Sequence, residues 1–461
     1  MEPSPTSRPK REIAWTTAVL LAATTLLLPG MEIGAQEVAM KGGGGEAVTF
    51  TKDVAPILQE NCQACHQPNS IAPMSLMTYD QIRTWSHAVR TQIEARNMPP
   101  YHYDPGVGIQ DLKDDRRLSA QEINTIVRWI ETGMPEGDPA DMPPPREWPD
   151  ASEWQMAAEF GQPDLVIPSR PHTVPAEGPD IWFRPVVDTG ILENRCIRAI
   201  EIKPSVEGRP VTHHAIPTFR VEGGGPGGGG GTLTEYAVGK RGEIIPENAC
   251  RLAPADSQVS WEIHYSPQGE EVPDDIVEVG LWLYPQGHEP EYRQDLRNYR
   301  LERQGPGPVI DLAPHSTDMT QGFYSWDHPV RIDSFMPHGH YRLRAKWMEI
   351  YHPRTGDREL ISMVSNFHPG WQNSYTYEDH VAPLVEPGAV VILTAVHDNT
   401  ANNPHNPDPD QWVMRGSRTT DEMSHAWLAV THLDDAEYQR LLAEREAMAQ
   451  REDEDDAPGG D

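Results

Sequence analysis

The chain of 461 residues is poor in basic side chains and in apolar ones. Lysine and arginine number 38 against 70 aspartates and glutamates, which gives a formal net charge of -32. Binding to a phosphate backbone depends on basic surface, so this deficit excludes a nucleic-acid partner. Apolar residues make up only 37% of the chain, and no apolar run is long enough to cross a membrane twice. A membrane protein with several spans is therefore excluded.

Proline and glycine, by contrast, are abundant, with 45 and 37 residues. Each interior proline removes a helical hydrogen bond and clashes with the preceding turn. The bulk of the chain is therefore expected to form β-strands and loops. At roughly 150 residues per domain, the length predicts about three domains.

The first 35 residues have the layout of a secretory signal. Arg8, Lys10 and Arg11 precede an apolar run at 13–28, and small residues follow up to Ala35. Cleavage after Ala35 predicts a periplasmic or secreted protein with no stable membrane span. The alternative is an uncleaved anchor, for which the run is short, since a span takes ~20 residues.

Residues 46–135 are expected to form a small all-helical domain. Along 79–96, apolar residues recur at steps of three and four, as they do on one face of a helix. Ser119 and Glu122 make a capping box at the start of a further helix. A proline-rich linker is expected at 136–165.

From residue 166 onward, short β-type runs alternate with turn residues, and no helical pattern intervenes. This alternation is typical of sandwiches or jelly rolls, and the stretch is long for a single one. We therefore expect two in tandem, at 166–303 and 304–433, with the segment rich in glycine and proline as the seam. The tail at 434–461 starts with a helical pattern and ends in a run of acidic residues.

Cys62, Cys65 and His66 form a Cys-x-x-Cys-His motif, the signature of covalent c-type haem attachment. Two thiols meet the haem vinyl groups, and the imidazole of the next residue reaches the iron. A zinc site would need a second pair of ligands, and a redox dithiol would need a thioredoxin-like frame. The sequence offers neither, so the fold class expected is a small all-α cytochrome c domain with one haem, followed by two tandem all-β jelly-roll or sandwich domains.

The sixth ligand of this haem is expected to be Met98, which lies on a proline-stiffened loop after the second helix. Its thioether would raise the reduction potential and leave the haem to carry electrons only. Met74, Met77 and His102 are alternatives, and any of these methionines could simply fill the core.

The two remaining cysteines, Cys196 and Cys250, are expected to form a disulfide in the oxidising compartment that export implies. The alternative is two buried free thiols.

Histidine gathers at three places in the predicted β region, which are His213-His214, His264 and His338-x-His340. Side chains on a strand repeat every two residues, so His338 and His340 share one face. Adjacent histidines point to opposite faces, so His213 and His214 converge only at a bulge or a strand end. Each pair by itself could be ordinary surface histidine. Together with a methionine ligand, however, imidazole and thioether select copper.

On these residues, the stretch from 166 to about 432 resembles the copper type II, ascorbate-dependent monooxygenases, the group of peptidylglycine and dopamine hydroxylases. The resemblance implies two copper sites, an electron-storing one on His213, His214 and His264 and an oxygen-binding, catalytic one on His338, His340 and Met423. Val396-His-Asp-Asn-Thr400 and Asn402-Asn-Pro-His-Asn-Pro-Asp-Pro409 also resemble a bacterial branch in which this module follows a cytochrome c domain.

The chain departs from the peptide-hydroxylating members around the second of these sites. Those members hold a substrate carboxylate with an arginine two residues before the His-x-His, and with Asn and Tyr two and four residues after the methionine. Met336, His425 and Trp427 stand at these positions here. Peptidylglycine is therefore a poor substrate, and an apolar or aromatic compound fits better.

The sequence thus predicts an exported copper monooxygenase that hydroxylates a C–H bond of a small organic substrate with O2. Its own haem would take electrons from a redox donor and pass them to the first copper. The alternative is a haem and copper protein that transfers electrons or binds copper without catalysis. A third interpretation is a glycan-binding sandwich domain tethered to a cytochrome.

Overall fold

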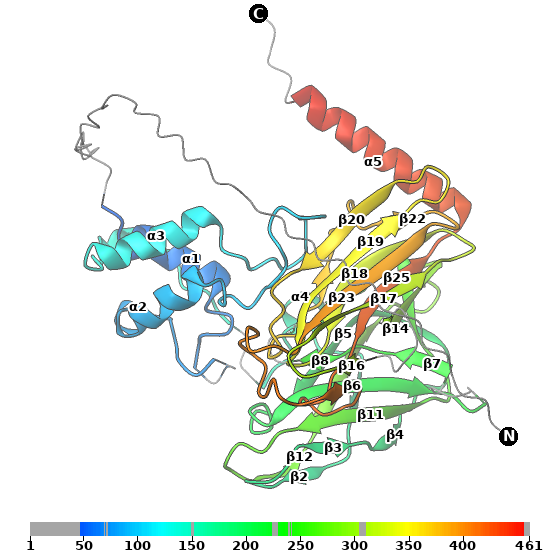
Figure 1. Cartoon of the computed structure of the whole chain (residues 1–461), viewed down its shortest axis with the longest axis horizontal. Coiled ribbons are helices and arrows are strands. Elements are labelled where there is room, and N and C mark those ends of the chain that lie inside the picture. The colour runs from blue at the N-terminus through cyan, green and yellow to red at the C-terminus, as the bar shows by residue number, and fades with distance from the viewer. Residues whose placement is uncertain are drawn as a thin grey trace, which may run out of the picture. The chain divides into compact units, whose positions relative to one another are not determined.

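A computed structural model describes residues 47–68, 70, 72–148, 152–223, 229–237, 240, 242–303 and 310–455. The expected signal segment, 1–35, lies outside the described residues. Strands dominate the described part, and helices are few (Figure 1). This confirms the expectation of a mostly β protein, which was drawn from the proline content. None of the described helices combines the length and the apolar character that a membrane crossing needs.

The helices lie at the two ends of the described chain, and all but one precede the first strand. They are η1 (Phe50–Val54), α1 (Ala55–Asn61), α2 (Tyr79–Glu94), α3 (Ala120–Glu131), η2 (Pro139–Asp141), α4 (Ala157–Phe160) and α5 (Asp435–Asp455). The predicted capping box of α3 is confirmed, because Ser119 Oγ accepts the Glu122 N–H at 3.1 Å and the Glu122 carboxylate accepts the Ser119 N–H at 2.8 Å. The helices up to α3 close over one apolar core that contains Leu58, Ile82 and Trp129.

The largest sheet has ten strands and runs through both expected β regions. Its order is β1 (Leu165–Pro168), β13 (Val277–Leu283), β5 (Arg195–Pro204), β10 (Ala249–Ala253), β14 (Tyr292–Arg300), β25 (His425–His432), β18 (Val330–His338) and β21 (Tyr375–Thr376), with β9 (Glu243–Ile244) on β5 and β22 (Leu384–Val385) on β18. The link between the two halves is β14, which pairs parallel with β10 and antiparallel with β25 (Figure 1).

Two further sheets each belong to one half of the β region. The first half has β3 (Ile181–Phe183), β11 (Gln258–Tyr265), β6 (Thr212–Arg220) and β7 (Gly229–Thr232), with β4 (Val186–Asp188) on β11 and β8 (Tyr236–Ala237) on β6. The second half has β15 (Glu302–Arg303), β17 (Thr317–Tyr324), β23 (Val390–Asp398), β19 (Leu343–Tyr351) and β20 (Arg358–Val364). Two small ladders join β12 (Val272–Asp275) to β2 (His172–Val174), and β16 (Asp311–Leu312) to β24 (Val413–Met414).

Two apolar clusters correspond to these two halves. One is built from residues 165–283, and the other gathers Tyr299, Leu301 and later strands together with residues from the loop after α2. The second cluster therefore takes in β14, although the seam is predicted at residue 304. Trp154 and Met156, in the predicted linker, pack on Trp282.

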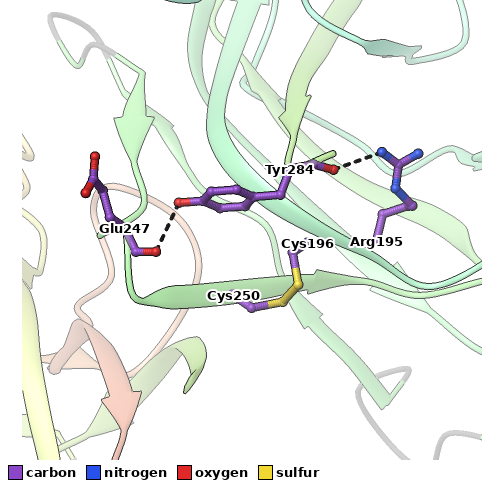
Figure 2. The surroundings of a disulfide bond; sticks show 5 residues. All are labelled: Arg195, Cys196, Glu247, Cys250 and Tyr284. Atoms are coloured by element: carbon purple, nitrogen blue, oxygen red, sulfur yellow. Dashed lines mark hydrogen bonds between the residues drawn. A yellow bond between two sulfur atoms is a disulfide. The ribbon is translucent and has the colours of Figure 1, made fainter. Parts of the chain in front are cut away.

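Cys196 and Cys250 form the expected disulfide, so the alternative of two free thiols is wrong (Figure 2). They lie on the neighbouring antiparallel strands β5 and β10, with their Cα atoms 5.0 Å apart. Beside them, Arg195 donates a hydrogen bond to the carbonyl of Tyr284 at 3.0 Å. The bond therefore fastens two strands of the ten-stranded sheet.

Removing this disulfide should lower the free energy of unfolding. The two cysteines are 54 residues apart in sequence. Closing a loop of that length in the unfolded chain contributes about 4 kcal/mol in the chain-entropy model. We expect that loss in urea unfolding of the Cys196→Ala, Cys250→Ala double variant. An unchanged midpoint and slope would mean that the disulfide does not restrict the unfolded chain enough to stabilise the fold.

The buried side chain of Glu235 should make the free energy of unfolding depend on pH. Burial raises the pKa of this carboxyl from 4.5 to about 7, while the charge of Lys240 opposes this rise. The folded protein then keeps a proton that the unfolded chain releases, so its stabilising contribution is present below pH 4.5 and is lost as pH rises through 7. Glu235→Gln should match the native protein near pH 4.5 and exceed its free energy of unfolding by about 3 kcal/mol at pH 8. A difference that stays constant between these pH values would contradict this reading.

Candidate functional site

His213, His214 and His264 come together at the end of two paired strands, and we call them the first imidazole group. His214 on β6 faces His264 on β11, but the next residue of β11, Tyr265, faces Thr212. His213 is thus an extra residue in the ladder, which is the bulge that convergence of adjacent histidines requires. Ring nitrogens of all three histidines lie within 4.8 Å of one another. The predicted convergence of these three side chains is therefore present.

The surroundings of the first imidazole group keep its rings neutral and fixed. Trp182 stacks on His264 with ring centroids 4.3 Å apart, and Asp180 Oδ2 lies 3.0 Å from His264 Nε2. Neither ring nitrogen of His264 has an aligned hydrogen-bond partner. Burial, followed by the charge of His264, lowers the pKa of His213 to about 4. Neutral imidazoles with free lone pairs are the form that binds metal ions.

His338, His340 and Met423, which we call the second group, lie where β18 ends and β25 begins. The rings of His338 and His340 are 5.7 Å apart between centroids. His338 Nδ1 is buried without a partner, and His340 Nδ1 lies 3.2 Å from the carbonyl of Asp421. This carbonyl accepts the Nδ1 proton of His340 and so leaves its Nε2 lone pair for a ligand.

A buried carboxylate organises the second group. Glu422 is fully buried and accepts hydrogen bonds from the backbone N–H groups of His340 at 2.5 Å, Arg342 at 2.8 Å and Met423 at 2.7 Å. It therefore ties the turn after β18 to the residues before β25. Nothing in the sequence distinguishes this glutamate from the many others, so it was not predicted.

A buried lysine and a further histidine also contact the second group. Lys346 Nζ donates to the carbonyls of His338 at 2.6 Å and His425 at 2.5 Å. The ring of His425 stacks on that of His338, with centroids 4.2 Å apart. Burial, then the charges of His425 and His340, lowers the pKa of His338 well below its usual value. His425 was singled out in the sequence only as a departure from a substrate-binding position.

The two groups lie within electrostatic reach of each other. Burial lowers the pKa of His214 far below its usual value, and the charges of His213, His264, His338 and His340 add to this effect. His340 also contributes to the lowered pKa of His213. A positive charge on one group therefore lowers the pKa of histidines in the other.

Cys62, Cys65 and His66 form a single turn directly after α1. The N–H groups of Cys65 and His66 both donate to the carbonyl of Cys62, at 3.1 and 2.9 Å. The two thiols are free, and burial, with the charge of Cys65, raises the pKa of Cys62 to about 12. His66 Nδ1 lies 3.0 Å from the carbonyl of Met74, so this nitrogen carries the proton and Nε2 remains available.

The four candidates for a sixth haem ligand are spread over two loops. Met98 is half-buried in the loop after α2, and its N–H lies 3.3 Å from the carbonyl of Gln92. His102 follows in the same loop, whereas Met74 and Met77 lie before α2. A cavity of about 910 Å³ opens beside Cys65 and extends along β5 and β10. The choice of Met98 stays a prediction.

His102 belongs to a third imidazole cluster that was not predicted. Its ring stacks on His368 with centroids 5.6 Å apart, and His368 contacts His405 at 4.6 Å. Burial, then the charges of the two other histidines, lowers the pKa of His102 to about 4. The three residues are far apart in sequence and come from three loops, so spacing gave no signal for them.

Comparisons with known proteins do not assign the chain to a family. No protein-family model matches the sequence, and no curated protein matches it. Among solved structures, the chain is similar to the major capsid protein P2 of bacteriophage PM2, with 11% identity and a TM-score of 0.28 over 59% of this chain and 97% of the capsid chain. A likeness at that level carries no functional argument.

Proposed function

We propose that the chain is an exported, periplasmic or secreted copper monooxygenase that hydroxylates a C–H bond of an organic substrate with O2. In this proposal the helical region is a cytochrome c domain with one covalent haem, and each β half contributes one copper site. The observation that carries the proposal is the bulge that brings His213, His214 and His264 together.

Both imidazole groups have the donor chemistry that copper prefers. The first offers three neutral imidazoles, and the second offers two imidazoles and a thioether, a set that suits copper cycling through its reduced state. Among the described residues, the set of mutually close donors consists of three imidazoles without a carboxylate, whereas a hard cation prefers oxygen ligands. Asp180 Oδ2 lies 3.0 Å from Nε2 of His264 and is an outer partner of that ring. The two copper ions, when bound, would each deliver one electron to the reaction with O2. The haem would pass these electrons to the copper ions.

The residues of the chain hold these donors in place. Trp182 fixes the ring of His264 by stacking, and the carbonyl of Asp421 fixes the tautomer of His340. Glu422 holds the backbone on both sides of the second group. Such partners of ligands orient the ligands and raise metal affinity.

The Cys62–His66 turn fits a c-type haem by the same reasoning. Both thiols are free to attach, and the Met74 carbonyl leaves Nε2 of His66 for iron. Metal-ligating histidines commonly donate their other N–H to a backbone carbonyl in this way. Met98 is proposed as the sixth ligand.

The substrate is proposed to be apolar or aromatic. Met336 and Trp427 are cross-strand partners beside the second group, at positions where a carboxylate-binding member would carry polar residues. Trp427 lies 6.0 Å from His425 between ring centroids. Oxygen uptake with a panel of aromatic and aliphatic compounds tests this, and uptake with none of them would favour the electron-transfer or copper-binding alternative.

A further inference from the structure

We propose that Arg300 and Arg415 form an anion-binding site beside the second group, and that the substrate is an apolar or aromatic compound that carries a carboxylate. This inference rests on the proposed function and deepens it, because it names the chemical class of the substrate. Neither arginine occupies a position by which the peptide-hydroxylating members bind a carboxylate.

The register of three neighbouring strands places Arg300 in one row with two histidines. Arg300 on β14 lies opposite His425 on β25, and His425 lies opposite His338 on β18. Residues directly opposite each other in antiparallel strands point to the same face of the sheet. The rings of His338 and His425 stack on each other, as this arrangement requires. The side chain of Arg300 therefore leaves the sheet on the same face as the imidazole of His338.

Arg415 approaches the second group from a different element. It directly follows β24 and forms a β-bridge with Glu422, the residue before Met423. Burial, followed by nearby positive charges, lowers the pKa of His425 well below its usual value, and both Arg300 and Arg415 contribute to this effect. Two positive side chains from distant segments thus act on one histidine beside the second group.

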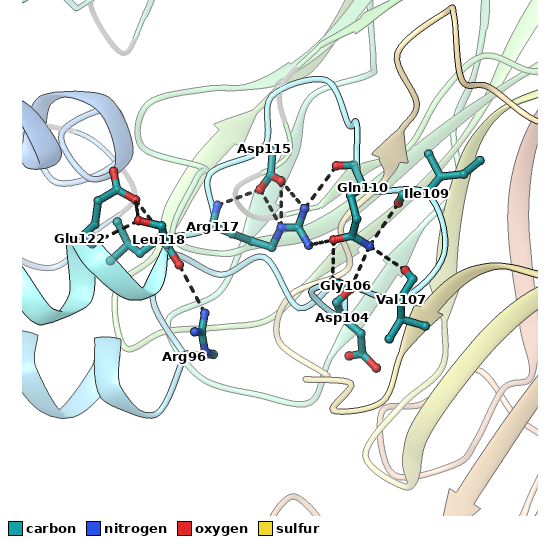
Figure 3. Close-up of polar contacts among 11 residues, drawn as sticks. Arg96, Asp104, Gly106, Val107, Ile109, Gln110, Asp115, Arg117, Leu118 and Glu122 are labelled. Atoms are coloured by element: carbon teal, nitrogen blue, oxygen red, sulfur yellow. Dashed lines mark hydrogen bonds and ion pairs between the residues drawn. The ribbon is translucent and has the colours of Figure 1, made fainter. Parts of the chain in front are cut away.

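Two other arginines of the chain show how a guanidinium group is held when it has partners (Figure 3). Arg117 donates to both carboxylate oxygens of Asp115 and to the side chain of Gln110, and Arg96 donates to the carbonyl of Leu118 at 3.3 Å. In the part of the chain that the structure describes, no carboxylate or other acceptor binds the guanidinium groups of the two proposed residues. These two groups are therefore available to an external anion.

The arginines of β14 differ between its two faces. Arg293 and Arg297 lie on one face, where both donate to the carboxylate of Asp295, at 3.0 and 2.6 Å. Arg300 is three residues beyond Arg297, so its side chain points to the other face. In a chain with a net charge of -32, an arginine without a carboxylate is the exception. Its planar guanidinium group suits a carboxylate, which it binds through two parallel hydrogen bonds.

The next row on the same face offers an apolar surface and a hydrogen-bond donor. Met336 and Trp427 lie opposite each other, one row from His338 and His425. Met336 is buried, and the indole Nε1 of Trp427 is buried without a hydrogen-bond partner. A buried donor without an acceptor costs free energy, which an oxygen atom of a ligand would offset. This row suits the apolar or aromatic body of an acid whose carboxylate lies at the arginines.

A cavity reaches this face of the sheet. Ser334 and Ala429 form the row beyond Met336 and Trp427, and both line the cavity of about 910 Å³ that opens beside Cys65. Successive rows on one face are ~7 Å apart, so the cavity comes within one row of the apolar surface. Its volume is typical of sites for small molecules. A small aromatic acid can therefore approach the second group from this side.

Calorimetric titration of the full-length protein with benzoate, phenylacetate and hydrocinnamate tests the site. Copper is first removed with a chelator, so that a carboxylate cannot bind a metal ion in place of the arginines. We expect at least one acid to bind about tenfold or more tightly than its neutral amide, because hydrogen bonds between charged groups are the stronger ones.

Arg300→Gln should weaken binding of that acid about tenfold or more and leave binding of its amide unchanged. Trp427→Phe keeps an aromatic ring and removes the donor, and it should weaken binding of the acid severalfold. Arg297→Gln is the matched control, since Arg297 is an exposed arginine on the opposite face of the same strand. It should bind the acid as the native protein does.

Both proposed arginines are exposed, so the Arg300→Gln, Arg415→Gln double variant should fold, which circular dichroism checks. Equal affinity of this variant and the native protein for the acid overturns the site. So does equal affinity of the native protein for acid and amide, a comparison that needs no variant, or binding of none of the three acids. Arginine-dependent binding of an acid that supports no oxygen uptake in the copper-loaded protein confirms the site and contradicts the proposed function.

Discussion

Met423→Ala is expected to abolish substrate-dependent oxygen uptake while the haem absorbance stays unchanged. The thioether is the soft donor of the second group, and its loss removes the ligand that favours reduced copper. The backbone should hold, because the N–H of Met423 is bound by Glu422 and its carbonyl lies 3.2 Å from Nε2 of His397. Removing a ligand should cost more than the roughly 10–100-fold lost with an outer partner.

Met414→Ala is the matched control for this prediction, since Met414 is an exposed methionine on β24. It should retain the full rate of oxygen uptake. Equal rates in the two variants would show that the second group does not take part in the reaction, and the proposed function would then reduce to its electron-transfer alternative.

Glu422→Gln is expected to weaken both the fold and copper binding at the second group. The carboxylate is fully buried, accepts three backbone N–H groups, and its charge acts on the buried Lys346. The amide replaces one acceptor with a donor aimed at an N–H group, and it removes the charge that opposes the lowering of the Lys346 pKa by burial. Leaving a buried backbone N–H without an acceptor costs about 1–3 kcal/mol of unfolding free energy, and loss of the buried charge adds to this.

Urea unfolding and copper titration measure the two effects separately. We expect loss of copper from the second group and retention by the first, which Glu422 does not touch. Glu446→Gln, at an exposed position of α5, should change neither quantity. If Glu422→Gln keeps both its stability and two coppers, the organising role of this carboxylate is wrong.

Local sequence patterns predicted part of the fold and part of the candidate site. Few residue types can cap a helix as Ser119 does or form a disulfide as Cys196 does, so the sequence was enough to predict both features. The convergence of His213 and His214 was foreseen only as a condition, a bulge or a strand end. The register of β6 and β11 supplies that bulge.

What the sequence could not foretell depends on pairings between distant segments. Glu422 and Lys346 act through backbone groups that are brought near them by β18 and β25, and no spacing encodes that. His102 meets His368 only because the loop after α2 docks on the second β half. The same holds for β14, whose place beside β25 joins the two halves in one sheet.

The number of haem and copper groups per chain is the most direct test of the proposed function. Protein exported by a host that matures c-type cytochromes, then loaded with copper and freed of excess, should hold one covalent haem and two coppers by mass spectrometry and elemental analysis. His264→Ala should hold one haem and one copper. Protein that carries the haem but no copper, or whose copper content is the same after His264→Ala, would contradict the proposal.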